Sequence, residues 1–152
     1  MNLPIRKVLF PTDLSERGNA ALELAASIAR DNQATLIMAH VLERFQPMVS
    51  AAAIVPPVEQ HEREEELRRL HPMDPEVPFE HRVLQGPPAT MILKLADEEG
   101  VDMIVMSTHG RTGVARFLMG SVAEEVVRKA SCLVLTARDP LHFTAEVVAA
   151  QE

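Results

Sequence analysis

The sequence predicts a three-layer α/β/α sandwich built on a five-stranded parallel sheet. Short apolar segments, typical of strands, alternate along the chain with segments whose apolar residues recur every three or four positions, as in helices. This alternation requires right-handed crossovers and therefore a parallel sheet with helices on both faces. The strands are nearly continuous apolar runs, as expected where both faces of a sheet are buried.

The first part of the chain contains a strand–helix–strand unit. Residues 5–10 form an apolar strand that a proline ends, and residues 34–41 repeat the strand pattern. Between them, Ala20, Leu24 and Ile28 have the spacing of the apolar stripe of an amphipathic helix. Two strands joined by a helix are therefore expected at the start of the sheet.

The second part repeats the alternation. A weaker strand is expected over 77–84, followed by a helix over 87–100 that begins at paired prolines and ends at a glycine. Residues 101–106 give the clearest strand pattern in the chain. A helix over 122–130 and a strand over 132–135 complete the five-stranded sheet.

Two stretches between the second and third strands depart from the regular pattern. Residues 43–60 contain three prolines and are expected to form a long loop with at most a short helical piece. Residues 62–70 are predicted to form a charged, solvated helix, on which Glu64 and Arg68 are spaced for an ion pair.

Length and composition limit the possible functions. The 152 residues suffice for one domain, expected over 1–140 with a C-terminal tail over 141–152. A net charge of −7 and the absence of Trp and Tyr argue against a nucleic-acid partner. No apolar run has the roughly 18 residues of a membrane span, and no secretory signal is evident, so we expect a cytoplasmic protein without a membrane partner. The single cysteine, Cys132, excludes an internal disulfide and is expected to start a buried strand as an inert residue.

Ligands of open parallel sheets bind beyond the carboxyl ends of the strands, where the chain reverses its winding direction. For a sheet of order 3-2-1-4-5 this reversal lies between the first and fourth strands. The segments that follow these strands are Pro11-Thr12-Asp13 and residues 107–113, which read Ser-Thr-His-Gly-Arg-Thr-Gly. Both are predicted to open into one crevice.

The second of these segments leads to Gly120 and Ser121, at the start of the last helix. Glycines allow backbone amides to approach an anion closely, and a helix start offers unpaired N–H groups and the positive end of the helix dipole. Arg111 and the Ser121 hydroxyl can add hydrogen bonds to the same anion. The carboxylate of Asp13 would repel phosphate but suits the paired hydroxyls of a ribose.

Together these segments resemble the universal stress protein family, specifically its ATP-binding branch. The resemblance covers roughly residues 4 to 138 and rests on Pro11-Thr12-Asp13 and on Gly110, which nine residues separate from Gly120-Ser121. The family motif begins with a glycine at the position of Ser107. The resemblance implies a Rossmann-like fold related to the adenine nucleotide alpha hydrolases.

The resemblance also implies roles for individual residues. Pro11, Thr12 and Val41 would line an adenine pocket, and Asp13 would bind the ribose. Residues 107–113 and 120–122 would hold the phosphates, with Mg2+ or Mn2+ bound through phosphate oxygens and not by the chain. The implied nucleotide-binding residues are Pro11, Thr12, Asp13, Val41, Met106, Ser107, His109, Gly110, Arg111, Thr112, Gly113, Gly120, Ser121 and Val122.

Members of this family commonly form homodimers through the last strand. Here that strand, Cys132 to Thr136, is an apolar candidate for a sheet edge, and an exposed apolar edge invites aggregation. Pairing with the same strand of a second copy would cover it. A homodimer is therefore expected.

Several of these residues also have structural interpretations. Asp13 with Glu16, and Ser121 with Glu124, have the spacing of a helix capping box. The glycines near position 110 fit ordinary turns. Histidine is a common acid–base residue, but without a second base evident near His109 a hydrogen-bonding role is favoured over catalysis. His40, near the end of the second strand, is expected to be structural.

The function predicted from the sequence is a nucleotide-dependent regulator in the stress response that binds ATP and is not an enzyme. A slow ATPase is an alternative, but the chain has no Gly-x-x-x-x-Gly-Lys-Ser/Thr motif to supply a phosphate-bound lysine. A nucleotide-free interaction scaffold of the same fold is another alternative, and Ser107 is its best sequence support.

Overall fold

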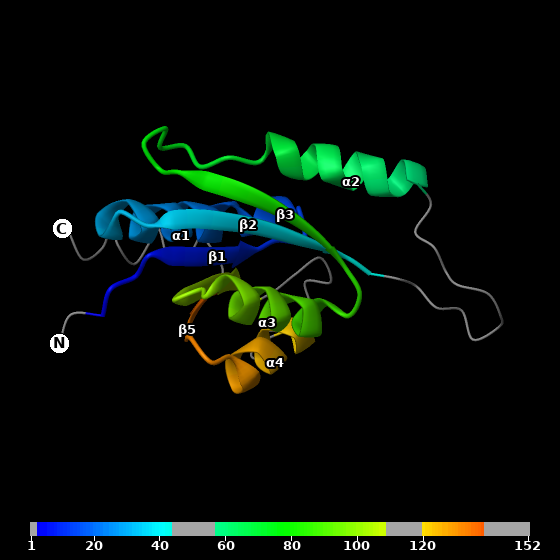
Figure 1. The fold of residues 1–152 in the computed structure, drawn as a ribbon. Helices are drawn as coiled ribbons and strands as arrows, with labels where there is room; N and C mark the ends of the chain where they lie inside the picture. The colour runs from blue at the N-terminus through cyan, green and yellow to red at the C-terminus, as the bar shows by residue number, and fades with distance from the viewer. Residues whose placement is uncertain (1–2, 44–56, 109–119, 139–152) are drawn as a thin grey trace.

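The computed structural model describes residues 3–43, 57–108 and 120–138 (Figure 1). All strands in this part of the chain are parallel and form one five-stranded sheet of order β3-β2-β1-β4-β5. This confirms the predicted fold class and strand order. The strands are β1 (Lys7–Pro11), β2 (Thr35–Leu42), β3 (Phe79–Gln85), β4 (Met103–Ser107) and β5 (Leu133–Ala137).

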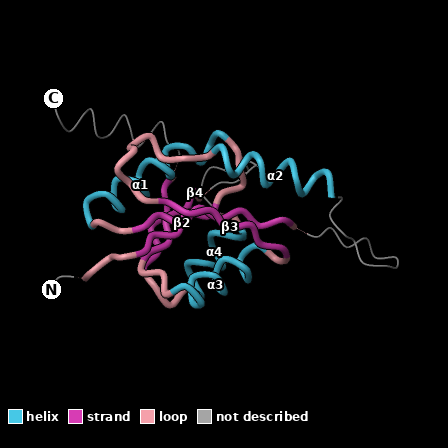
Figure 2. The backbone as a smooth tube through the Cα atoms, turned by 45° about the horizontal axis from the view of Figure 1, so that its top comes forward, coloured by secondary structure: helices cyan, strands magenta, loops and turns pink. Residues whose placement is uncertain are grey.

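Helices cover both faces of the sheet. Figure 2 shows α1 and α2 on one side and α3 and α4 on the other. None of the helices in the described ranges is long and apolar enough to cross a membrane. The helices are the 3-10 turn η1 (Glu16–Gly18), α1 (Asn19–Asn32), α2 (Pro57–Arg69), α3 (Pro88–Glu99) and α4 (Ser121–Lys129).

Each face of the sheet has its own apolar core, because successive side chains of a strand point to opposite faces. In β1, Val8 and Phe10 point to the α1/α2 side and Leu9 to the α3/α4 side. Four buried alanines let α1 pack closely on the first of these faces: Ala21, Ala25, Ala26 and Ala29. The second core is built from aliphatic residues of α3, α4 and the strands, including Ile92, Leu95, Val126 and Ile104.

The helix ends follow local backbone chemistry. Gly100 ends α3 in the left-handed conformation (φ 64°), as the sequence predicts, and its N–H donates to the carbonyls of Ala96 and Asp97. Pro87 caps the start of the same helix, where a missing N–H costs nothing. At the end of α1, Gln33 adopts the left-handed conformation (φ 56°) that glycine more often supplies.

Several sequence-based element boundaries were wrong in detail. The helix expected over 62–70 begins earlier, at Pro57, because proline suits a first helical turn. Of the loop expected over 43–60, residues 44–56 lie outside the described residues. The ion pair of Glu64 and Arg68 is present, with Nη2 and Oε2 3.9 Å apart. The first, third and fourth strands each start two residues later than expected.

Cys132 also differs from its expectation. It precedes β5 instead of starting it, and it is half-buried. The strand that follows is not buried either, since β5 is a sheet edge with Leu133 and Leu135 exposed. Burial and the nearby carboxylates of Asp97 and Asp102 raise the pKa of the Cys132 thiol. At any given pH the raised pKa leaves less of the reactive thiolate.

Candidate functional site

The loop after β1 is a closely hydrogen-bonded turn. The Thr12 N–H donates to the Ala39 carbonyl of β2 at 2.8 Å, which continues the strand pairing by one residue. The Leu14 N–H then donates to Thr12 Oγ1 (2.9 Å), and Leu14 itself adopts a left-handed backbone (φ 66°), which is uncommon for a residue with a side chain. The chain direction thus reverses immediately beyond the strand.

Asp13 lies at the centre of this turn. Its Oδ1 accepts hydrogen bonds from the N–H (2.9 Å) and the hydroxyl (2.6 Å) of Ser15, and its Oδ2 is almost without solvent exposure. The capping-box interpretation of Asp13 and Glu16 is wrong: η1 follows Ser15 and α1 follows Gly18, neither with a side-chain cap. The left-handed residue after Asp13 separates its carboxylate from the helix start.

Thr108, the first residue after β4, bonds both β5 and Gly120. The Thr108 N–H (2.9 Å) and hydroxyl (3.3 Å) both donate to the Ala137 carbonyl at the end of β5, and the residue is 4% exposed. The Thr108 carbonyl in turn accepts from the Gly120 N–H at 2.7 Å. Residues 109–119 lie outside the described residues, but this hydrogen bond brings the two flanks of that segment together.

Gly120 is favoured by close approach, not by backbone angle. Its φ of −57° suits any residue, but a Cβ there would lie 3.2 Å from the Thr108 carbonyl oxygen. Gly120 is also the N-cap of α4, and Ser121 is the first helical residue. The capping box expected for Ser121 and Glu124 is therefore wrong, and no side-chain cap hydrogen bond is formed at this helix start.

The start of α4 leaves backbone amides for a ligand. The Gly120 N–H bonds Thr108, and the first intrahelical bond runs from the Glu124 N–H to the Gly120 carbonyl at 3.0 Å. The three amides between them, at 121–123, belong to the first helical turn, where the helix itself supplies no acceptor. These N–H groups form the positive end of the α4 dipole.

The switch point of the sheet lies between these two segments, because β1 and β4 are neighbours in the centre of the sheet. Their register ends at the pair Leu9–Ile104, although β1 continues to Pro11 and β4 to Ser107. The carboxyl ends of the two strands are therefore outside the ladder that joins them, as expected where a ligand crevice opens in this class of fold.

Several predicted nucleotide-binding residues lie on the α3/α4 side of the sheet. Met106 is a member of that face's buried core, and Val41 and Val122 pack against it. Pro11 is buried, Thr12 and Ser107 are half-buried, and Ser121 is exposed. Five further predicted residues lie outside the described residues: His109, Gly110, Arg111, Thr112 and Gly113.

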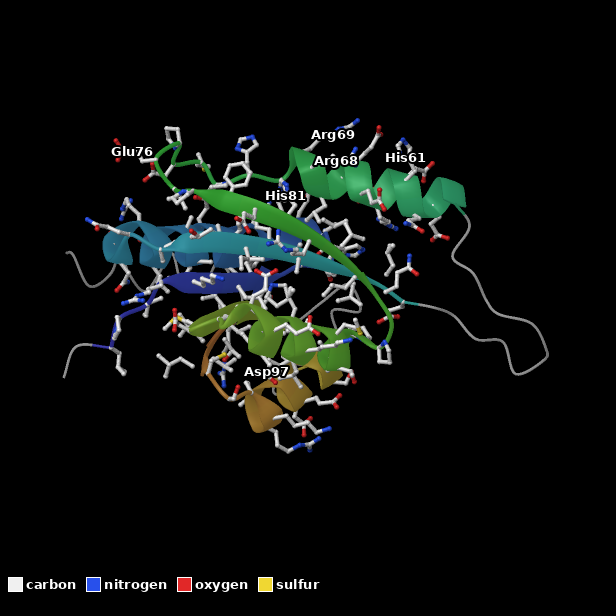
Figure 3. All side chains as sticks on the ribbon, in the orientation of Figure 1. His61, Arg68, Arg69, Glu76, His81 and Asp97 are labelled. Carbon is white, nitrogen blue, oxygen red and sulfur yellow. The ribbon has the colours of Figure 1, made fainter. Side chains whose placement is uncertain are left out.

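A cavity of about 280 Å³ opens on the opposite, α1/α2 side. It shares one residue, Thr12, with the predicted nucleotide site. Arg69, which also lines it, lies at the C-terminal end of α2 (Figure 3). The complete lining is Phe10, Thr12, Leu14, Ser15, Gly18, Asn19, Glu66, Arg69 and Leu70. This cavity adjoins the loop after β1 but is not the space between that loop and α4.

Two residues shape the site through partners that the sequence did not specify: Thr108 lies within the segment 107–113 expected to hold the phosphates, and His40 is the histidine expected to be structural. Thr108 and His40 are the buried polar residues among those described. The Thr108 hydroxyl donates to the Ala137 carbonyl at the end of β5, and His40 Nδ1 bonds the Thr12 carbonyl in the loop after β1. Both are polar residues near the end of an apolar strand. This sequence pattern does not predict which backbone carbonyl the side chain binds. No group of three or more His, Cys, Asp and Glu side chains is arranged for a metal ion within the described ranges.

Comparison with known proteins decides the family. The model of the universal stress protein family matches residues 4–138. The chain belongs to the universal stress protein family. A universal stress protein of Methanocaldococcus jannaschii, MJ0531, is 33% identical over 142 residues, which are 89% of this chain and 83% of the relative.

Solved structures of this family share the fold. Universal stress protein UspA from Lactobacillus plantarum superposes with a TM-score of 0.77 at 24% identity, covering 90% of this chain and 100% of the other. A universal stress protein in complex with cAMP superposes with a TM-score of 0.59 at 26% identity, covering 89% of this chain and 98% of that one. The latter protein therefore binds an adenine nucleotide.

Proposed function

We propose that this universal stress protein binds an adenine nucleotide, ATP together with Mg2+ or Mn2+, beyond the carboxyl ends of β1 and β4. One observation carries the proposal: the Asp13 turn and the α4 start are held by hydrogen bonds at the ends of the two central strands. The first offers a carboxylate for sugar hydroxyls, and the second offers amides for phosphate. The cAMP-bound relative supports adenine as the base.

The phosphate end of the proposed site is the first turn of α4. Its first-turn amides, for which the helix itself supplies no acceptor, and the helix dipole favour an anion, and the exposed Ser121 hydroxyl can donate a further hydrogen bond. The first-turn acid Glu124 is exposed and also lies at this helix end. A divalent cation on the phosphate oxygens would reduce its repulsion of the phosphates, so the cation belongs to the proposed ligand. Residues 107–113 contribute in the proposal through Ser107, His109, Gly110, Arg111, Thr112 and Gly113.

The base and sugar occupy the β1 and β2 side of the site. Val41, Met106 and Val122 all belong to the α3/α4-side core or pack against it, so they offer an apolar wall to an adenine ring. Pro11 and Thr12 complete this wall at the end of β1. Asp13 accepts hydrogen bonds from the ribose hydroxyls, which supply donors that a carboxylate can satisfy.

The proposed role is regulation in the cytoplasm, with nucleotide occupancy changing which partner the protein binds. Both loops of the site connect directly to secondary structure, because the first leads into α1 and the second into α4. A bound nucleotide would bridge them and stabilise the folded state by mass action. Phosphate release that saturates with ATP and disappears in Gly120→Val would instead identify a slow ATPase.

A titration of ATP and Mg2+ into protein freed of nucleotide tests the proposal. We expect Asp13→Asn to weaken binding roughly tenfold, because it removes the charge of an acceptor while its remaining oxygen still accepts from Ser15. The matched control is Asp97→Asn, the same change at an exposed aspartate bonded to Ser131. It should leave affinity within about twofold. A wild-type protein that gives neither heat nor a melting shift would favour the scaffold function.

We further propose that the protein is a homodimer joined through β5. This strand is a sheet edge, and Leu133 and Leu135 are exposed to 45% and 36% on its surface. Leu133→Lys should yield monomers in light scattering, because the charge would be buried between copies. Phe79→Lys, at the other edge strand with a similar exposure of 42%, should leave the dimer intact. Monomeric wild-type protein at high micromolar concentration would overturn the proposal.

A further inference from the structure

His40 is a buried polar residue whose partner lies on a different strand. It is located near the end of β2 and is 9% exposed. Its ring nitrogen Nδ1 lies 2.8 Å from the carbonyl oxygen of Thr12, in the loop that follows β1. A buried histidine at the candidate site therefore contacts the backbone immediately before Asp13.

The chemistry of this contact determines which ring nitrogen of His40 carries the hydrogen. A carbonyl oxygen can only accept a hydrogen bond, so Nδ1 must carry the hydrogen and donate it. The bond thus selects one tautomer of the neutral ring, with the proton on Nδ1. A partly buried carbonyl left without a donor is unfavourable, so the contact resists rearrangement of the loop.

The bond also orients Asp13. The Thr12 carbonyl belongs to the peptide unit that joins Thr12 to Asp13, and a peptide unit is planar. β2 holds Thr12 twice, since the Ala39 carbonyl accepts from its N–H at 2.8 Å and His40 donates to its carbonyl. With the preceding peptide plane fixed, the Asp13 carboxylate is set by its bonds to Ser15.

We propose that His40 is a positioning residue for nucleotide binding: its Nδ1–H fixes the peptide plane before Asp13 and thereby places the carboxylate for the ribose. This inference rests on the proposed function. It assigns His40 a task beyond packing, because an apolar residue of similar size could fill the same space but could not hold the Thr12 carbonyl. It involves no contact between His40 and the nucleotide.

Two amide substitutions separate this role from general packing. Asparagine places its NH2 group where histidine has Nδ1, whereas the NH2 group of glutamine corresponds to Nε2. We expect His40→Asn to keep ATP–Mg2+ affinity within about threefold of wild type, and His40→Gln to lose about tenfold, with melting temperatures of the two variants close to each other. Equal losses of affinity in both variants would overturn the proposal.

A double-variant cycle tests whether His40 acts through Asp13. If it does, His40→Gln should weaken binding much less in an Asp13→Asn background than in wild type, because the group it positions has already lost its charge. Independent, multiplicative losses would contradict the positioning role. The cycle uses the titration described above, with the intact chain throughout.

A third measurement does not depend on nucleotide binding. The 15N chemical shifts of the His40 ring report which nitrogen carries the proton, and the proposal expects the Nδ1–H form in neutral solution. An Nε2–H tautomer would overturn the inference even if ATP binds. Conversely, an Nδ1–H ring in a protein that fails to bind any adenine nucleotide would contradict the proposed function and leave the loop contact intact.

Discussion

The two ends of the parallel sheet use the same side-chain chemistry for different purposes. At the amino ends, Asp102 joins strands: its Oδ2 accepts from the N–H groups of Arg6 (2.8 Å) and Lys7 (3.0 Å) across the space between β4 and β1. At the carboxyl ends, Asp13 shapes a turn through Ser15. The comparison teaches that an aspartate beside a central strand joins strands at one end of the sheet and shapes a turn at the other, where the proposed function gives its carboxylate to a ligand.

Helix direction accounts for this division. The amino ends of the strands follow the ends of helices, where carbonyls are left over and cations are favoured, as in the bond from Lys7 Nζ to the Glu99 carbonyl (2.8 Å). The carboxyl ends precede helix starts, where the amides of α4 favour anions. Variants at the two ends should therefore separate stability from binding.

The largest effect is expected at the amino end. Asp102→Ala removes the acceptor of two backbone N–H groups, one of them partly buried, and should destabilise the protein by about 2–3 kcal/mol. Thermal unfolding should show this as a melting temperature lower by roughly 4–12 °C. The affinity of the folded protein for ATP–Mg2+ should be unchanged. A loss of affinity without a loss of stability would contradict the assignment of the amino end to stability.

Two glycine substitutions give smaller effects, and they are expected to differ in ATP affinity but not in stability. Gly120→Ala puts a Cβ 3.2 Å from the Thr108 oxygen and should reduce ATP affinity about fivefold while costing about 1 kcal/mol of stability. Gly100→Ala should cost a similar amount of stability, because Gly100 has a φ of 64°, but should leave affinity unchanged. Calorimetric titration and thermal unfolding of both variants measure the contrast. Equal affinities for the two variants would remove the special role of Gly120.

The smallest effect concerns the Cys132 thiol near the amino end of β5. Burial raises its pKa, and Asp97 and Asp102 raise it further, so less thiolate is present at neutral pH. Its reaction with a disulfide reagent at pH 7.5 should be slower than that of free cysteine. Asp97→Asn should accelerate it slightly by removing one negative charge. A rate equal to that of free cysteine would show that the amino-end carboxylates and burial do not affect the thiol.

The alternation of strands and helices could be predicted because hydrophobic periodicity is local in sequence. The order of the strands does not follow from periodicity and rests on the resemblance to the family. The end of α3 could also be predicted, since Gly100 is the residue best suited to a left-handed cap. The capping boxes could not be judged from spacing, because the outcome at Asp13 depends on the left-handed backbone of Leu14. Nothing in the residue type of Leu14 predicts that conformation.

The supporting residues of the site were less predictable than its location. The switch point follows from strand order alone, but Thr108 and His40 act through hydrogen bonds to the distant residues Ala137 and Thr12. Such contacts depend on how loops fold against neighbouring strands. A sequence predicts that a buried polar residue needs a partner without indicating which one.

A crystal structure with ATP and Mg2+ tests the central claim most directly. The account predicts nucleotide density beyond the carboxyl ends of β1 and β4, with the ribose hydroxyls bonded to Asp13 and a phosphate against the amides of residues 121–123. Nucleotide bound instead in the cavity beside Arg69, or at the amino end near Asp102, would contradict it.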